Sequence, residues 1–175
     1  MRKSVDNENG FTIVELLATC LIVAVAVTLG ATAIRHYWRL QGLRGGVEQV
    51  VSELRGQQQE AGSASHPYVW GTWFKSNSNR WGVVRGNINT GSCQVLSRRT
   101  FDAGVTISSV SFANIDSFGL SANCSAAAEN GATVALFLAR GTATGGSVSL
   151  THPDVSGGAP RTISVSPITG RVTQP

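Results

Sequence analysis

Residues 11–34 read FTIVELLATCLIVAVAVTLGATAI, an apolar stretch with a single charged residue, Glu15. As a helix, a stretch of this length can cross the apolar core of a bilayer. A polar leader, MRKSVDNENG, precedes it at residues 1–10, and the aromatic and basic segment RHYWR follows it at residues 35–39. Aromatic and basic side chains of this kind are typical of the membrane–water interface. The pattern predicts a transmembrane helix over residues 11–34.

The position of Gly10 argues against a simple secreted protein. A secretory signal peptide has its small-residue cleavage site after the apolar core, so that the core is removed. In this chain the small residue at a processing position, Gly10, comes before the apolar stretch. Cleavage there would remove the leader and leave the helix attached to the rest of the chain.

Glu15 is unusual because it lies inside the apolar stretch. A lone carboxylate costs about 2.5–3.5 kcal/mol at the bilayer centre, and such a residue is a candidate for function. Near the helix start, however, it can reach the headgroups and favour the positive end of the helix dipole. Position alone leaves both interpretations open.

The octet GFTIVELL at residues 10–17 resembles the prepilin processing motif of type IV pilins and type II secretion pseudopilins. The resemblance implies cleavage between Gly10 and Phe11 by a membrane-embedded aspartic prepilin peptidase, and N-methylation of Phe11 by the same enzyme. It also implies that Glu15 interacts with the N-terminal amine of a subunit in the growing filament. Two charges that are costly apart in an apolar filament core would compensate each other there.

The same resemblance implies a location and a set of partners. It places a single span in the cytoplasmic (inner) membrane, with the head of the protein in the periplasm or the extracellular space. After assembly the protein would belong to a pilus or pseudopilus. The implied partners are other pilins or pseudopilins and an ATPase-powered assembly platform in the inner membrane.

The helix is predicted to continue past the membrane interface to about Ala61, a total length of roughly 75 Å at 1.5 Å per residue. Apolar residues recur at steps of three and four, which is the pattern of an amphipathic helix. Gly42, Gly45 and Gly46 are weak helix formers and predict a bend or a partly melted turn. The apolar stripe consists of Leu40, Leu43, Val47, Val50, Val51 and Leu54.

From Pro67 onward the hydrophobic period changes to two, which predicts a β-rich head. The run ALFL at residues 135–138 is too apolar for an exposed edge and predicts a strand packed on both faces. The aromatic residues Trp70, Trp73, Phe74 and Trp81 are interpreted as core. Candidate strands are Tyr68–Phe74, Trp81–Arg85, Gln94–Thr100, Val105–Phe112, Thr133–Ala139, Ser147–Thr151 and Thr162–Ser166.

The C-terminal third resembles FimT/GspH-type minor pilins and pseudopilins. The matching pieces are Ser111-Phe112, Phe118-Gly119, Gly146 to Leu150, and the ending RTISVSPITGRV at residues 161–172. The resemblance implies an α+β, pilin-like fold in which two β-sheets, or one bent sheet, pack on the amphipathic half of the long helix. The expected organisation is a leader (1–10), a transmembrane helix (11–34), an amphipathic half (35–64) and a β-rich head (65–175).

The cysteines differ in their surroundings. Cys20 lies in the apolar stretch, where a thiol behaves as a small hydrophobe, whereas Cys93 and Cys124 lie in the polar head. If the head is exported, we expect a disulfide between Cys93 and Cys124. Closing that loop would stabilise the fold by roughly 3–4 kcal/mol through the entropy of the unfolded chain. Two buried free thiols are the alternative.

No catalytic motif is present. The three histidines, His36, His66 and His152, have no metal-ligand spacing. The sequence contains no nucleophile elbow, phosphate-binding loop or zinc-protease helix. We therefore predict no catalytic residues, no metal and no cofactor, and a protein that is a substrate of enzymes rather than an enzyme.

DNA is an alternative partner. From residue 35 onward there are 12 Lys or Arg and 7 Asp or Glu, a balance of +5. Arginines such as Arg98, Arg99 and Arg171 could hold phosphates by salt-sensitive contacts. Some FimT-type pilins take up DNA through a Gly-Arg-x-Arg segment; this chain has GRVT at residues 170–173 and lacks the second arginine.

The leading hypothesis is a minor pilin or pseudopilin, with a DNA-binding minor pilin of a competence filament second. An anchored β domain that never polymerises is the third.

Overall fold

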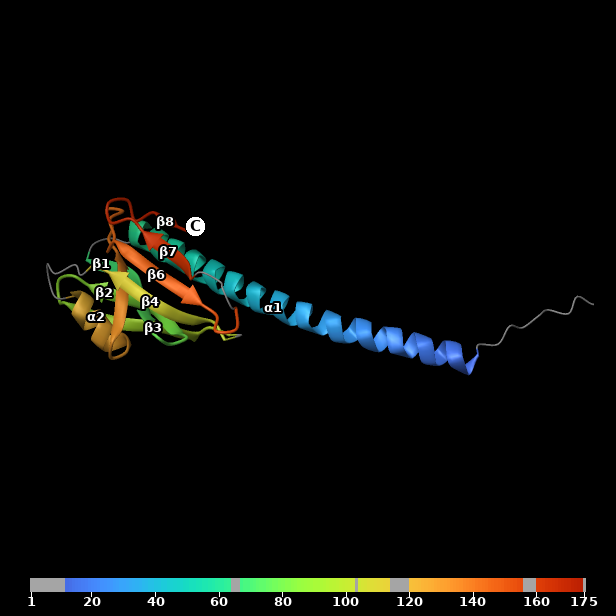
Figure 1. Cartoon of the computed structure of the whole chain (residues 1–175). Helices are drawn as coiled ribbons and strands as arrows, with labels where there is room; N and C mark the ends of the chain where they lie inside the picture. Colours follow the sequence, from blue (N-terminus) through green and yellow to red (C-terminus); the bar gives the residue numbers. More distant parts are fainter. Residues whose placement is uncertain (1–11, 64–66, 103, 114–119, 156–159, 175) are drawn as a thin grey trace, which may run out of the picture. The chain divides into compact units, whose positions relative to one another are not determined.

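The computed structural model describes residues 12–63, 67–102, 104–113, 120–155 and 160–174. The chain divides into two compact units, Met1–Trp38 and Arg39–Pro175. We call the second of these the head unit. The secondary structure is α+β, as predicted, with one long N-terminal helix followed by antiparallel strands (Figure 1).

Helix α1 spans Ile13–Ser63. It begins where Thr12 supplies an N-cap: the backbone N–H of Glu15 donates to Thr12 Oγ1 at 3.3 Å, and that of Leu16 donates to the Thr12 carbonyl at 3.1 Å. The bond to Oγ1 satisfies a donor that has no partner inside the helix, and the bond to the carbonyl is the first intrahelical bond of α1. By length and composition, Ile13–Ala31, with a mean hydropathy of 2.4, can cross a membrane.

The glycine cluster does not interrupt α1. Gly42, Gly45 and Gly46 are all helical, so the predicted melting at this point is wrong. A Cβ on Gly46 would lie 3.3 Å from Val105 Cγ1 and 3.6 Å from Phe101 Cδ1. The glycine thus allows the helix to lie close to the segment that contains Phe101 and Val105. Packing there stabilises a stretch whose intrinsic helix propensity is low.

The apolar stripe of α1 faces the core of the head unit, as predicted. Val50 and Leu54 are fully buried, and Leu40 is half-buried. The other members of the stripe, Leu43, Val47 and Val51, are buried as well.

The strands of the head unit form two four-stranded antiparallel sheets, which confirms the two-sheet alternative. All seven predicted strands are present, and their ends differ from the prediction by at most two residues. Sheet A has the order β3-β2-β1-β5, with β1 Tyr68–Lys75, β2 Arg80–Asn87, β3 Ser92–Thr100 and β5 Ala132–Phe137. Sheet B has the order β4-β6-β7-β8, with β4 Thr106–Phe112, β6 Gly146–Thr151, β7 Arg161–Val165 and β8 Val172–Thr173.

The prediction missed two elements. Helix α2, Leu120–Ala128, has the sequence LSANCSAAA, in which small residues hide any apolar period. Isolated helices of this length are marginal in water, so tertiary packing must supply most of its stability. Strand β8, Val172–Thr173, is two residues long and too short to show a period.

Sheet A has a hydrophobic core on each face. On one face, Phe74, Trp81 and Phe137 pack with the stripe of α1 and with the inner face of sheet B. On the other face, Trp73 and Leu136 belong to a second cluster that includes residues of α2. The predicted two-sided packing of β5 and the burial of three aromatics are therefore confirmed. Trp70 is half-buried.

Candidate functional site

The start of α1 carries the predicted assembly residue. Glu15 is exposed at the first turn, three residues after the N-cap Thr12. A Thr followed by Glu at this spacing is the pattern of a capping box, which favours helix initiation at this point. Gly10 and Phe11, the predicted processing residues, lie outside the described residues.

Apolar side chains surround this start and continue along α1. Ile13, Leu21 and Leu29 are 80%, 68% and 70% exposed, and nothing in the window Ile13–Ala31 is buried. Soluble monomers rarely expose a contiguous apolar surface of such extent. This helix surface requires an apolar environment, which a bilayer or the packed core of a filament can provide.

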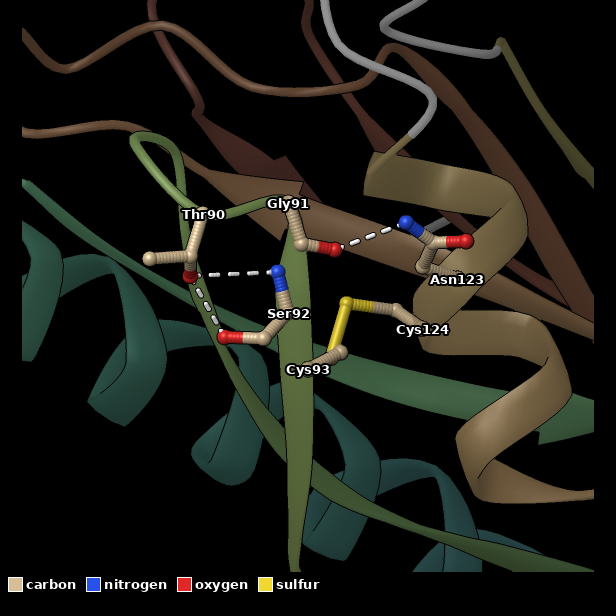
Figure 2. Close-up of a disulfide and its surroundings, with 6 residues drawn as sticks. All are labelled: Thr90, Gly91, Ser92, Cys93, Asn123 and Cys124. Carbon is tan, nitrogen blue, oxygen red and sulfur yellow. Dashed lines mark hydrogen bonds between the residues drawn. A yellow bond between two sulfur atoms is a disulfide. The ribbon is translucent and has the colours of Figure 1, made fainter.

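Cys93 and Cys124 form the predicted disulfide, and the alternative of two free thiols is wrong. The bond joins β3 to α2, with 5.0 Å between the two Cα atoms (Figure 2). Beside it, Asn123 Nδ2 donates to the Gly91 carbonyl at 2.7 Å. Cys124 is completely buried in the second core cluster. The covalent link and the hydrogen bond hold a short helix that could not persist alone.

The turn before β3 is ordered by its own hydroxyl groups (Figure 2). Ser92 donates its backbone N–H to Thr90 Oγ1 at 3.4 Å, and the two side-chain oxygens are 2.6 Å apart. Asn87 Oδ1 accepts from the backbone N–H groups of Asn89 and Thr90 at 2.9 and 3.3 Å. The β2–β3 turn is therefore a rigid attachment for the disulfide.

Of the predicted DNA contacts, Arg99 is already engaged within the head unit. Its Nη1 lies 2.7 Å from Glu53 Oε2 of α1, and its guanidinium lies 5.3 Å from the centre of the Trp81 ring. Trp81 is its register partner on β2. An incoming phosphate would have to compete with the Glu53 carboxylate for this arginine.

Arg98 and Arg171 lie in different sheets. Arg98 is exposed on the edge strand β3 of sheet A, and Arg171 is exposed on the turn before β8 of sheet B. The β7–β8 turn contacts α1 through Gln58, whose Nε2 donates to the Thr169 carbonyl at 3.2 Å. Positions 53 and 58 are separated by about 140° around a helix, at roughly 100° per residue. The structure thus attaches Arg99 and the Arg171 turn to different sides of α1, and it does not gather the predicted arginines into one patch.

Sequence reasoning missed an ion cluster at Glu129. Glu129 Oε1 lies 2.5 Å from Lys75 Nζ of β1 and 2.6 Å from Arg80 Nη2 of β2. The hydrogen bond from Lys75 lowers the pKa of Glu129 below its usual value, and the charges of Arg80 and Arg98 act in the same direction. Lys75 and Arg80 flank the β1–β2 turn, but Arg98 and Glu129 are distant from them in the sequence, and the strand register brings them together.

The described residues contain no group of three or more His, Cys, Asp or Glu side chains that could hold a metal ion. His152 is buried, and its Nδ1 accepts the backbone N–H of Asp154 at 3.2 Å, which is a local turn contact. Asp154 in turn pairs with Arg39 at 3.4 Å. Asp154 thus joins the segment after β6 to Arg39 of α1, and His152 makes a local contact within that segment.

Comparison with known proteins shows a relationship of fold. No protein-family model matches the chain, and no curated protein matches it significantly. Two solved structures of the minor pseudopilin EpsH from the type 2 secretion system of Vibrio cholerae are similar to it. The alignment with the first has a TM-score of 0.51 at 10% sequence identity, and it covers 73% of this chain and 91% of the EpsH chain. The alignment with the second has a TM-score of 0.53 at 13% sequence identity, and it covers 77% of this chain and 93% of the EpsH chain. At this identity the likeness shows the fold: the chain has a pilin-like fold of the kind seen in a minor pseudopilin.

Proposed function

We propose that this protein is a structural subunit, a minor pilin or pseudopilin, of a type IV pilus or type II secretion filament. The observation that carries the proposal is the continuity of α1. The first part of this helix is apolar with nothing buried, and the second part is buried in a pseudopilin-like head unit through a regular stripe. A subunit built this way can be held in a membrane and later packed with its neighbours through the same apolar surface.

In this proposal the N-terminus is processed between Gly10 and Phe11 by a prepilin peptidase, and Phe11 is N-methylated. The processed chain would keep α1 in the cytoplasmic membrane until an assembly platform transfers it into the filament. Glu15, exposed at the first turn, would then pair with the N-terminal amine of a neighbouring subunit. In an apolar filament core this pairing would compensate two charges that are costly alone.

Mass spectrometry of the natural protein tests the processing step. We expect an N-terminus at Phe11 that carries one methyl group. An unprocessed N-terminus would contradict the proposal because the leader would still precede α1. A cut beyond the apolar stretch would contradict it because the membrane-spanning part of α1 would be removed.

Replacement of Glu15 by Ala tests the assembly step. We expect the variant to accumulate in the membrane and to be largely absent from filaments. Glu60→Ala is the matched control, since Glu60 is an exposed acid at the other end of α1. If Glu15→Ala enters filaments as well as Glu60→Ala does, Glu15 has no role in assembly.

A further inference from the structure

Two open hollows, of about 260 and 530 Å³, lie along the second half of α1. They share the lining residues Glu48 and Gln174, and together they form what we call the α1 groove. Its α1 side is built from residues at steps of three and four between Arg44 and Gln59, which is one face of a helix. Arg161, at the start of β7, lines the groove from sheet B. Figure 1 shows β7 and β8 beside this part of α1.

The α1 groove has a surplus of positive charge. Arg44, Arg55 and Arg161 are exposed and have no ion-pair partner among the residues that the structure describes. The groove contains one acid, Glu48, so its lining carries three positive charges and one negative charge, a net +2. A concave surface with a net charge focuses the field and attracts groups of the opposite sign.

The helix backbone in the groove is uncovered. A Cβ placed on Gly56 would meet no atom within 4 Å, and the same holds at Gly45 beside the groove. From Arg44 to Gln59 a helix rises about 22 Å, at 1.5 Å per residue. The groove therefore has the length of several helical turns, and it lets a partner segment approach the backbone of α1 closely.

A second copy of this chain does not match the groove electrostatically. Residues 35–175 carry 12 basic and 7 acidic residues, a net +5. Of the described acids of the head unit, Glu53, Glu129 and Asp154 are already paired with basic side chains, which leaves Glu48, Glu60 and Asp102 as single exposed acids. Two such heads in contact would repel, because they would lie within a Debye length of about 10 Å.

We propose that the α1 groove is the surface through which this chain contacts an acidic segment of a different subunit of its filament. This inference rests on the proposed function, since it presupposes that the chain enters a filament. It adds the chemistry of the neighbour: a segment with two or more carboxylates that enters the groove and pairs with Arg44, Arg55 and Arg161. The chain would then be placed singly among acidic subunits, because copies of it repel one another.

Photo-crosslinking in native filaments identifies the neighbour. A benzoylphenylalanine is introduced at Gln59 in the groove, and in a second strain at Ser111, which is exposed on the outer face of sheet B. We expect the Gln59 adduct to contain a different pilin-type subunit, joined within a segment rich in Asp and Glu, and we expect no such adduct from Ser111. An adduct with a second copy, with lipid or with DNA, or the absence of any adduct, would overturn the inference.

Charge reversal tests the role of the arginines. The double variant Arg44→Glu/Arg55→Glu is compared with Arg85→Glu/Arg140→Glu, which changes the net charge by the same amount outside the groove. We expect the Gln59 adduct to fall at least about tenfold in the groove variant, because attraction is replaced by repulsion across the contact. The control should keep its adduct within about twofold. An equal loss of the Gln59 adduct in both double variants would overturn the inference, because it would show that the contact depends on the net charge of the chain and not on the arginines of the groove.

The incorporation assay separates the two proposals. If the unmodified chain is absent from filaments, the proposed function fails. If the chain enters filaments and the groove variant keeps its adduct, the proposed function stands and only the acidic neighbour is contradicted. Replacement of the cross-linked acids of the partner by Lys should restore the adduct of the groove variant.

Discussion

Arg99 of the edge strand β3 and Glu53 of helix α1 form an ion pair, with 2.7 Å between Nη1 and Oε2. The other oxygen of Glu53 accepts a hydrogen bond from Gln57 Nε2 at 2.8 Å. The guanidinium of Arg99 also lies over the Trp81 ring. Glu53 is not part of the apolar stripe of α1, and its carboxylate joins the helix to β3, the edge strand of sheet A.

The Arg99–Glu53 pair should stabilise the head unit by about 1 kcal/mol, since it is partly buried and is reinforced by the contact with Trp81. A double-mutant cycle with Glu53→Gln and Arg99→Gln measures this coupling in urea unfolding of the full chain in detergent micelles. The cycle of Glu53→Gln with Arg140→Gln is the control, and its coupling should be close to zero. A zero coupling in the first cycle would contradict the structural role of the pair.

The disulfide should contribute about 3 kcal/mol to the stability of the head unit, from the loop between Cys93 and Cys124, 31 residues apart. Cys93→Ala/Cys124→Ala is expected to lower the urea midpoint and to release α2 before the sheets unfold. Hydrogen exchange of the α2 amides reports that release. Cys20→Ala, at the exposed cysteine of α1, should change neither measurement.

Burial of the α1 stripe gives a third prediction. Leu54→Ala should cost about 2–5 kcal/mol, because it removes a fully buried side chain and leaves a cavity. Leu96→Ala removes the same atoms from a side chain that is 42% exposed, and it should cost less than about 1 kcal/mol. Equal midpoints in urea unfolding for the two variants would show that α1 does not pack on the sheets as described.

The Glu129 cluster makes stability depend on pH. The pKa of Glu129 is lowered in the folded state, so its contribution is complete above the usual carboxyl pKa and is lost as the pH falls through the folded value. Glu129→Gln should therefore destabilise the head unit at pH 7, and the difference from the wild type should shrink as the pH falls toward 3. Glu60→Gln, at an exposed acid, should show no comparable pH dependence. A difference between wild type and Glu129→Gln that grows on acidification would contradict this sign.

Weak DNA binding, if present, should not depend on a single arginine patch. Because Arg98 and Arg171 lie in different sheets, their replacement by Ala should weaken retention independently, each lowering the salt dependence of binding by about one unit of slope. Retention of the full chain on DNA across a salt series measures this. A loss in the double variant far greater than the product of the single losses would instead indicate one shared site.

Much of the fold could be predicted because periodicity is a local property. The stripe at steps of three and four and the alternation after Pro67 follow from the side of each element that is buried. The unbroken apolar stretch shows itself by length and composition alone. The disulfide was predicted as well, from an even pair of cysteines in the polar head and the expectation that the head is exported. Helix α2 escaped prediction because its stability comes from the disulfide and from packing on sheet A, neither of which is visible in LSANCSAAA.

Hydrophobicity and local spacing are enough to predict the long apolar helix, the acid near its start and the strand-rich head. Which charges find partners depends on how the elements pack. Strand register brings Lys75 and Arg80 to Glu129, and sheet packing brings Arg99 to Glu53. The same packing leaves Arg44, Arg55 and Arg161 beside an open groove with no ion-pair partner among the described residues. Ion pairs form between residues that are close in space but distant in the sequence, so no local sequence pattern could reveal them.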